Sequence, residues 1–299
     1  MVSHGSMAAP AKVNLALHVT GRRADGFHLL DTLVAFTRHG DLLEVEESAE
    51  DTLIVSGHYA AHVPIGESNL VTRARDLLRE VFGGEARAPV TLHLEKNLPV
   101  ASGIGGGSAD AAAALRLLAR HWEIDIADRQ LAQLGLRLGA DIPMCLASRP
   151  LIARGIGENL QTLSRFPTLH LVLVNPNIPL STPAVFSQLE KRENTALPVL
   201  QDLPDTASAA QWLSAARNDL EAPARLLVPQ IAEVLKRLVQ TGAMIARMSG
   251  SGATCFGLFP SAPLAERARS SLAEEHPDWF VLATQTQAAD QADAHHATT

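Results

Sequence analysis

The segment Pro99-Val-Ala-Ser-Gly103-Ile-Gly105-Gly106-Gly107-Ser108 joins an expected strand to an expected helix, and the rest of the fold is built outward from it. Glycines let backbone amides approach a polyanion without an intervening side chain. The helix that follows adds unpaired N–H groups and the positive end of its dipole, equivalent to about half an elementary charge. The segment therefore indicates a phosphate site, in which Ser108 offers a hydroxyl to a phosphate or a magnesium ion. By itself, a Gly-rich run serves plain turn geometry about as often.

This segment matches neither of the two common nucleotide-binding loops. The P-loop pattern G-x-x-x-x-G-K-[ST] is absent, and the βαβ context of a dinucleotide-binding fingerprint is missing. A different nucleotide-binding fold is therefore expected.

Hydrophobic periodicity predicts a mixture of strands and helices around the segment. In the first half, strands are expected at residues 12–20, 41–47, 51–56 and 90–95. Helices are expected at 70–81, 108–121 and 129–138, the first capped by Ser68 or Asn69 and ended by Gly83-Gly84. The second half repeats the mixture, with strands at 169–174, 244–248, 254–259 and 279–284 and a helix at 228–240. The fold class is α+β.

The length of 299 residues favours two domains. With a boundary near Arg165, they are an N-terminal nucleotide-binding domain at 7–165 and a C-terminal domain at 166–286. Residues 1–6 (MVSHGS) resemble an expression remnant, and the polar, Ala-rich residues 287–299 are expected to form a flexible tail.

Composition excludes several classes of partner. Hydrophobic residues make up 46% and charged residues 19%, as in proteins with a sizeable core. A net charge of −7 argues against nucleic-acid binding, which needs a dense Lys/Arg surface. No stretch approaches the roughly 18 apolar residues of a membrane span. Because Cys145 and Cys255 form no metal or redox motif, a reducing cytoplasm is the expected location. The sequence does not decide between a monomer and a homodimer.

Two further features point to the same ligand as the Gly-rich segment. Lys12 and Asn14 are two residues apart on an expected strand, so their side chains project from the same face. Asp141 in Gly139-Ala-Asp141-Ile-Pro143 is a carboxylate in an otherwise apolar stretch. Taken singly, a solvent-exposed edge lysine and a turn or cap aspartate are the commoner interpretations.

Three motifs together resemble those of the GHMP kinases, in the expected order. They are Pro10-Ala-Lys12-Val-Asn14-Leu, the 103–108 loop with Ala109-Asp110-Ala-Ala, and Met248-Ser-Gly250-Ser-Gly252-Ala. The resemblance extends from about residue 8 to 284 and includes Gly21-Arg-Arg-Ala-Asp-Gly26-Phe-His28, Arg154-Gly-Ile-Gly-Glu158 and Asn218-Asp219-Leu-Glu221. It implies a ribosomal-protein-S5-like N-terminal domain, a ferredoxin-like C-terminal domain and ATP as the phosphoryl donor.

The finer motifs are similar to those of members that act on cytidine diphospho-methylerythritol. This implies phosphorylation of the 2-hydroxyl of the erythritol unit in non-mevalonate isoprenoid biosynthesis. A homoserine or mevalonate kinase of the same family is an alternative, as is a non-catalytic nucleotide sensor on the same fold. Retention of both Lys12 and Asp141 speaks against the sensor.

The resemblance also implies roles for individual residues. Lys12 and Asp141 form the catalytic pair, while Pro99, Gly103, Gly105, Gly106, Gly107 and Ser108 bind ATP. Phe27, His28 and Phe186 form a cytosine pocket, and Asn14 and Thr182 contact the methylerythritol or its diphosphate. Asn69 and Lys96 are assigned to the nucleotide less firmly, since a helix cap and a solvated strand end explain them about as well.

Two residues depart from the family pattern. Phe27 stands where Tyr is more frequent, which keeps stacking but removes a phenolic hydrogen bond. Ala109 stands where many relatives have Ser, which removes a hydroxyl near the phosphates. No protein metal ligand is therefore assigned, and Mg²⁺ is expected mainly as the ATP complex.

Overall fold

The computed structural model describes residues 5–83, 88–200 and 202–289, which form two compact units. Unit 1 contains the described residues of Met1–Ala11, Gly40–Val100 and Gly105–Ala147, and unit 2 those of Lys12–His39, Ala101–Ile104 and Ser148–Thr299. Two long strands, β1 (Gly5–Arg22) and β2 (His28–Glu47), contribute a segment to each unit. The Gly-rich segment is likewise shared, since Gly103 belongs to unit 2 and Gly105 to unit 1.

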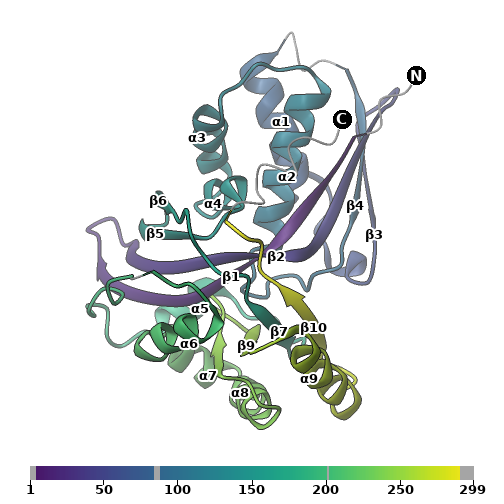
Figure 1. The fold of residues 1–299 in the computed structure, drawn as a ribbon. Coiled ribbons are helices and arrows are strands. Elements are labelled where there is room, and N and C mark those ends of the chain that lie inside the picture. Colours follow the sequence, from purple (N-terminus) through teal and green to yellow (C-terminus); the bar gives the residue numbers. More distant parts are fainter. Residues whose placement is uncertain (1–4, 84–87, 201, 290–299) are drawn as a thin grey trace. The chain divides into compact units, whose positions relative to one another are not determined.

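Unit 1 combines a sheet with four helices. In the sheet, β4 (Val90–Glu95) lies between β3 (Thr52–Ser56), to which it is parallel, and the antiparallel end of β2. Helices α1 (Leu70–Phe82), α2 (Gly106–His121), α3 (Asp128–Leu138) and α4 (Ile142–Ala147) pack on one another (Figure 1). Two 3₁₀ turns, η1 (Ala60–His62) and η2 (Gly66–Ser68), precede α1. The apolar stripe of α2 is buried throughout, which fixes this helix in the core.

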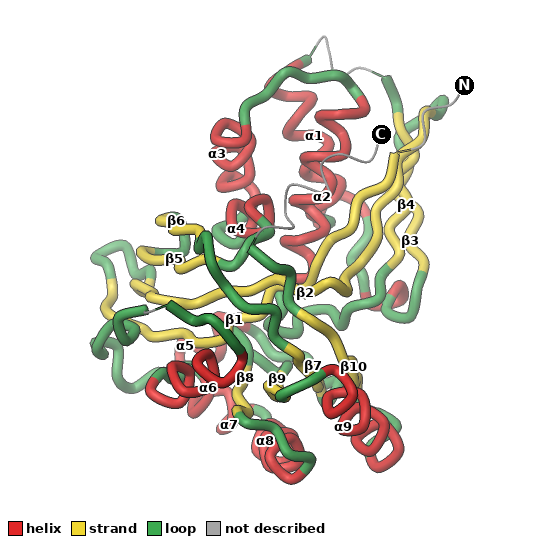
Figure 2. The backbone as a smooth tube through the Cα atoms, viewed as in Figure 1, coloured by secondary structure: helices red, strands yellow, loops and turns green. Residues whose placement is uncertain are grey.

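Unit 2 contains two groups of antiparallel strands. The first part of β2 pairs with β5 (Leu151–Gly155), which pairs with β6 (Asn159–Thr162). A second sheet has the order β10 (Phe280–Gln285), β7 (His170–Asn175), β9 (Cys255–Phe259), β8 (Ile245–Met248). Helices α8 (Gln230–Gln240) and α9 (Ala262–Glu275) pack on this sheet, as Figure 2 shows in red and yellow. The remaining helices are α5 (Thr182–Ser187), α6 (Thr206–Ala215) and α7 (Glu221–Leu227).

The predicted α+β class is confirmed, and each predicted helix and strand overlaps an observed one. Of the two N-cap candidates for α1, Asn69 is the cap, because its side-chain oxygen accepts from the Val71 amide at 2.8 Å. Helix α2 begins at Gly106, two residues before the predicted start. The prediction missed β5, β6, α4 to α7, α9 and most of the length of β2.

The ends of the chain extend the fold beyond the predicted limits. Strand β1 begins at Gly5, two residues before the expected start of the N-terminal domain. The expected tail begins at Gln287, whose amide donates to the Phe36 carbonyl at 2.7 Å. The rest of that tail, residues 290–299, lies outside the described residues, as does Gly84.

The domain boundary near Arg165 stays a prediction. Within the described ranges, no helix is long and apolar enough to cross a bilayer.

Candidate nucleotide and substrate site

The Gly103 loop packs directly against the turn at residues 249–252 in unit 2. Gly103 has φ +79°, and a Cβ added there would lie 2.6 Å from the Ser249 carbonyl oxygen and 2.7 Å from the backbone of Gly252. The Ser249 hydroxyl donates to the Gly103 carbonyl at 3.0 Å, and the Thr254 amide donates to Ser102 at 3.0 Å. Gly103 is therefore required both for its conformation and for the close approach of the two backbones.

Strand β1 reaches the same place through Lys12 and Asn14. The Lys12 amide donates to the Ile104 carbonyl at 2.9 Å, and the Asn14 amide donates to the Ser249 hydroxyl at 3.0 Å. The Asn14 side chain donates to Thr32 at 2.9 Å, and both residues are buried. These contacts place the backbone of Lys12 and Asn14 beside the Gly103 loop and the 249–252 turn. That the two side chains share a ligand stays a prediction.

Thr182 also joins this part of unit 2. It is the first residue of α5, and its hydroxyl forms a hydrogen bond of 2.7 Å with the hydroxyl of Ser251. Asn14, Gly103, Thr182 and the 249–252 turn are thus connected, although they come from four distant regions of the sequence. Their hydroxyl and amide groups suit a polar, oxygen-rich ligand.

On the unit 1 side, the Gly-rich segment forms the start of α2. Gly105 is the N-cap residue with φ +65° and has no side chain to cap the helix. The N–H groups of the first turn, which includes Gly107 and Ser108, therefore receive no side-chain cap. Pro99 is buried where the chain leaves β4. This is the backbone arrangement that favours an anion.

The expected catalytic pair is divided between the two units. Lys12 is only 5% exposed in unit 2, and Asp141 lies half-buried in unit 1. The Asp141 carbonyl accepts from the Cys145 amide at 3.1 Å, so Asp141 directly precedes α4. Both residues make interactions with other residues, and a direct contact between them stays a prediction.

The two less firmly assigned nucleotide residues have internal roles. Asn69 is the α1 cap, and its side-chain amide donates to the Pro64 carbonyl at 2.8 Å. Lys96 is not a solvated strand end. Its side chain is 3% exposed and forms ion pairs with the buried carboxylates of Asp41 and Asp110. Sequence reasoning missed this cluster, although Asp110 in the Ala-rich run of α2 was a carboxylate in an apolar context.

An aromatic pair occupies another part of unit 2. The rings of His28 and Phe186 are stacked, with centroids 4.7 Å apart and an interplanar angle of 18°. The Nε2 atom of His28 is buried and has no hydrogen-bond partner among the described residues. Burial lowers the pKa of His28, and the positive charges of Arg22 and Arg192 lower it further. Phe27 is 59% exposed and precedes His28 directly.

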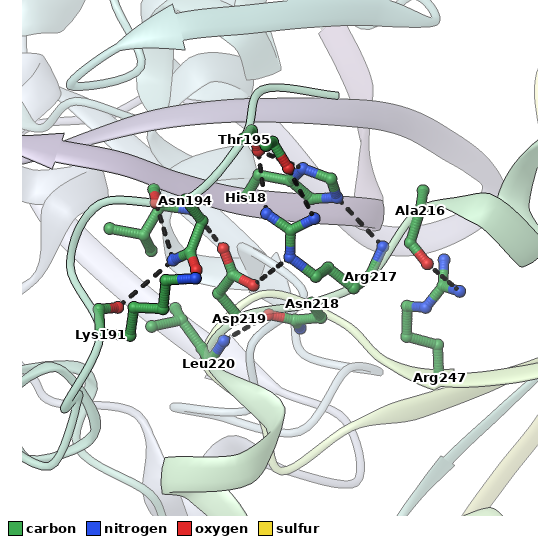
Figure 3. A network of polar contacts seen from close by, with 11 residues as sticks. His18, Lys191, Asn194, Thr195, Ala216, Arg217, Asn218, Asp219, Leu220 and Arg247 are labelled. Atoms are coloured by element: carbon green, nitrogen blue, oxygen red, sulfur yellow. Dashed lines mark hydrogen bonds and ion pairs between the residues drawn. The ribbon is translucent and has the colours of Figure 1, made fainter. Parts of the chain in front are cut away.

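The polar network drawn in Figure 3 connects residues 194–195, which follow α5, and residues 217–219 to strand β1. The His18 Nδ1 atom donates to the Thr195 carbonyl at 2.9 Å, and its Nε2 atom accepts from the Arg217 amide at 3.1 Å. The Asp219 carboxylate accepts from the Arg217 side chain and from the Val19 amide, at 2.6 and 2.7 Å. Residue Asn218 adds bonds to the carbonyls of Met248 and Gly250. The network therefore supports both the 249–252 turn and the region of Phe186.

These features are those of a nucleotide-dependent kinase fold, and the chain belongs to the GHMP kinase family. The model of the GHMP kinases N-terminal domain matches residues 69–149, and that of the GHMP kinases C-terminal domain matches residues 196–278. The N-terminal match contains Asp141 and helix α2 with Ser108. The C-terminal match contains the 249–252 turn.

Two relatives within the family are similar to this chain over nearly its whole length. The 4-diphosphocytidyl-2-C-methyl-D-erythritol kinase of Chelativorans sp. (strain BNC1) is 55% identical over 280 residues, which are 94% of this chain and 95% of that protein. A crystal structure of 4-(cytidine 5'-diphospho)-2C-methyl-D-erythritol kinase matches with TM-score 0.79 and 34% identity, covering 95% of this chain and 100% of that one. The homoserine kinase from Cytophaga hutchinsonii matches with TM-score 0.67 but 18% identity over 95% of each chain, and so shares the fold.

Proposed function

We propose that the chain transfers the γ-phosphoryl group of ATP to the 2-hydroxyl of 4-diphosphocytidyl-2-C-methyl-D-erythritol, in non-mevalonate isoprenoid precursor biosynthesis. The relatives that support this reaction match nearly the whole chain. The structural observation that carries the substrate assignment is the His28–Phe186 pair, because it combines a flat aromatic surface with a buried ring nitrogen that has no hydrogen-bond partner among the described residues. A pyrimidine base needs both a stacking surface and a hydrogen-bonding edge.

The protonation state of His28 suits recognition of a base. Because its pKa is lowered from the ordinary histidine value of 6.5, the imidazole is neutral at about pH 7. A neutral imidazole has one donor and one acceptor nitrogen, whereas the imidazolium would place a second cation beside Arg22 and Arg192. In this proposal Phe186 and Phe27 stack on the cytosine, and His28 binds its edge.

Transfer itself needs little covalent chemistry from the protein. Phosphoryl transfer depends mainly on positioning and on stabilisation of charge. We assign Asp141 to orient or deprotonate the 2-hydroxyl and Lys12 to stabilise the developing alkoxide. Asn14 and Thr182, which surround the 249–252 turn, hold the methylerythritol or its diphosphate.

The nucleotide is assigned to the Gly-rich segment and the start of α2. The uncapped N–H groups beyond Gly105 donate to the phosphate oxygens, and Ser108 contributes its hydroxyl. Within the described ranges, no group of three or more His, Cys, Asp or Glu residues could hold a metal ion. We propose that Mg²⁺ arrives with ATP, because this ion keeps several waters and needs one or two protein oxygens, for which the Ser108 hydroxyl is a candidate. Bound there, it would neutralise charge on the phosphates.

The decisive experiment is an ATP-consumption assay with three acceptors: the cytidine diphospho-methylerythritol, homoserine and mevalonate. Turnover with the cytidine compound alone is the expected result. Thermal shifts with CMP and CDP provide a second test, since a cytosine pocket should bind both without the erythritol. Stabilisation by an ATP analogue, with no shift by CMP or CDP, would sink the cytidine assignment.

We also propose that the protein works in the cytoplasm. Cys145 and Cys255, the two cysteines of the chain, are both buried, and a reducing compartment keeps cysteine side chains as thiols.

A further inference from the structure

A buried cluster of three ionisable side chains lies directly beneath the first turn of α2. The Lys96 ammonium contacts the Asp41 carboxylate and lies 2.7 Å from Oδ2 of Asp110. The side chains of the three residues are 3%, 0% and 5% exposed, respectively. Buried charges are costly unless they are paired, so the three side chains depend on one another.

Asp41 connects the cluster to the chain that leads into the Gly-rich segment. Its Oδ1 atom accepts from the amides of Asn97 and Leu98 at 2.6 and 2.8 Å. These residues follow β4 and directly precede Pro99. With the Lys96 ammonium as a third donor, the Asp41 charge is well compensated.

Asp110 connects the cluster to α2, and its charge is less well compensated. Its Oδ2 atom accepts from Lys96, whereas Oδ1 is buried without a partner among the described residues. Burial, with the negative charge of Asp41, raises the pKa of Asp110 to about 8, although Lys96 opposes this shift. The Lys96 ammonium therefore reduces the free-energy cost of burying a second carboxyl group, that of Asp110, next to Asp41.

Gly106 brings the helix start into contact with the cluster. A Cβ added to Gly106, the first residue of α2, would lie 3.0 Å from the Lys96 Nζ atom and 3.7 Å from Oδ2 of Asp41. The helix backbone thus rests on the ammonium group. A change in the cluster is transmitted directly to the N–H groups of the first turn.

We propose that Asp41, Lys96 and Asp110 are positioning residues for the nucleotide, which lock the first turn of α2 to the end of β4 and offset negative charge beneath it. The proposal rests on the proposed function, in that it takes the start of α2 as the phosphate site. Lys96 acts here through the backbone of Gly106 rather than by touching ATP. An anion at the helix start then meets an ordered set of N–H donors above a cluster whose lysine balances its carboxylates.

A double-mutant cycle separates this role from direct contact. In Lys96→Met, the buried Asp41 carboxylate remains without its cation, so the Kd for ATP, titrated without a second substrate, should rise about tenfold or more. In Lys96→Met with Asp41→Asn, that buried charge is removed, while an amide oxygen can still accept from Asn97 and Leu98, so most of the loss should be recovered. If Lys96 instead touches the nucleotide, the double variant binds ATP as weakly as the single one, and the proposal is overturned.

Two further variants keep the test sound if Lys96→Met does not fold. Gly106→Ala retains all three charges but places a methyl group against Nζ, and it should also raise the Kd for ATP; an unchanged Kd contradicts the proposal. Lys236→Met, at an exposed position on α8, is the matched control and should bind ATP as the parent does. Because nucleotide binding is read without the acceptor, failure of the cytidine assignment would appear in the turnover assay and leave this measurement interpretable.

Discussion

The hydroxyl of Ser249 donates a hydrogen bond to the carbonyl oxygen of Gly103, which lies 146 residues earlier in the chain. Ser249 is fully buried, and it also accepts from the Asn14 amide. One hydroxyl therefore joins the β1 strand, the Gly-rich loop and the turn that follows β8. Loops that bind ligands are often more mobile than the elements that they connect. The two hydrogen bonds of the Ser249 hydroxyl restrict the motion of the Gly103 loop.

Gly103→Ala is expected to disrupt this arrangement. The new methyl group would lie within 2.7 Å of backbone atoms of Ser249 and Gly252, so one loop must shift. Displacements of about 1 Å near reacting groups can reduce turnover about a hundredfold, and we expect kcat/KM for ATP to fall on that scale. Gly242→Ala is the control, because Gly242 also has positive φ but has open space around it. It should lose about 1–2 kcal/mol of stability and retain activity; equal kinetic losses in the two variants would show that backbone strain alone is responsible.

Asp141→Asn and Lys12→Ala are expected to separate chemistry from nucleotide binding. Each removes a group assigned to the acceptor hydroxyl, so turnover should fall by at least about a hundredfold, the scale of lost acid–base help. The Kd for ATP should change little. Asp128→Asn, at an exposed position in α3, is a matched control with expected parental kinetics. Near-parental turnover in both site variants would refute the catalytic assignment.

Phe186→Ala is expected to raise KM for the cytidine substrate and to spare KM for ATP. Stacking of a base on an aromatic ring contributes about 1–3 kcal/mol, which corresponds to a change of roughly tenfold to a hundredfold. Phe186→Tyr retains the ring beside His28 and should restore most of the affinity. Steady-state kinetics with each substrate varied in turn distinguish the outcomes, and equal effects on both KM values would remove Phe186 from the cytosine pocket.

Local patterns in the sequence predicted the parts of the site that local structure determines. Asn69 as a helix cap, the glycines before α2 and the strand that carries Lys12 and Asn14 all depend on neighbours in the chain. The secondary structure of the two halves and the family resemblance follow from the same short-range signals.

Contacts between distant residues could not be derived in this way. Asp41 and Lys96 are 55 residues apart, and Lys96 at a strand end looks the same in sequence whether it is solvated or buried between carboxylates. Short elements such as β6 and α5 also escaped, because a few residues show no clear period and depend on tertiary packing. The assignment of Lys96 to the nucleotide rests on the family resemblance and stays a prediction, whereas its ion pairs with Asp41 and Asp110 are visible only in the structure.

The charge cluster also makes stability depend on pH. Because the pKa of Asp110 is raised from 3.8 to about 8, the folded protein keeps a proton between these values that the unfolded chain has released. Unfolding then releases this proton, so the free energy of unfolding falls as pH increases, by up to about 1.4 kcal/mol per pH unit. This slope ends near pH 8, where the folded state also loses the proton.

Asp110→Asn should remove that contribution and flatten the dependence. Urea denaturation between about pH 5 and pH 8 gives the free energy of unfolding for parent and variant across the relevant window. Asp205→Asn is a matched control, since hydrogen bonds from Ser208 lower the pKa of the exposed Asp205 and place its titration below this window, while Asn also caps a helix well. We expect the Asp205 variant to keep the parental slope and the Asp110 variant to gain stability relative to the parent as pH rises. Parallel curves for parent and Asp110→Asn would mean that Asp110 is ionised throughout, with Lys96 sufficient to balance both carboxylates.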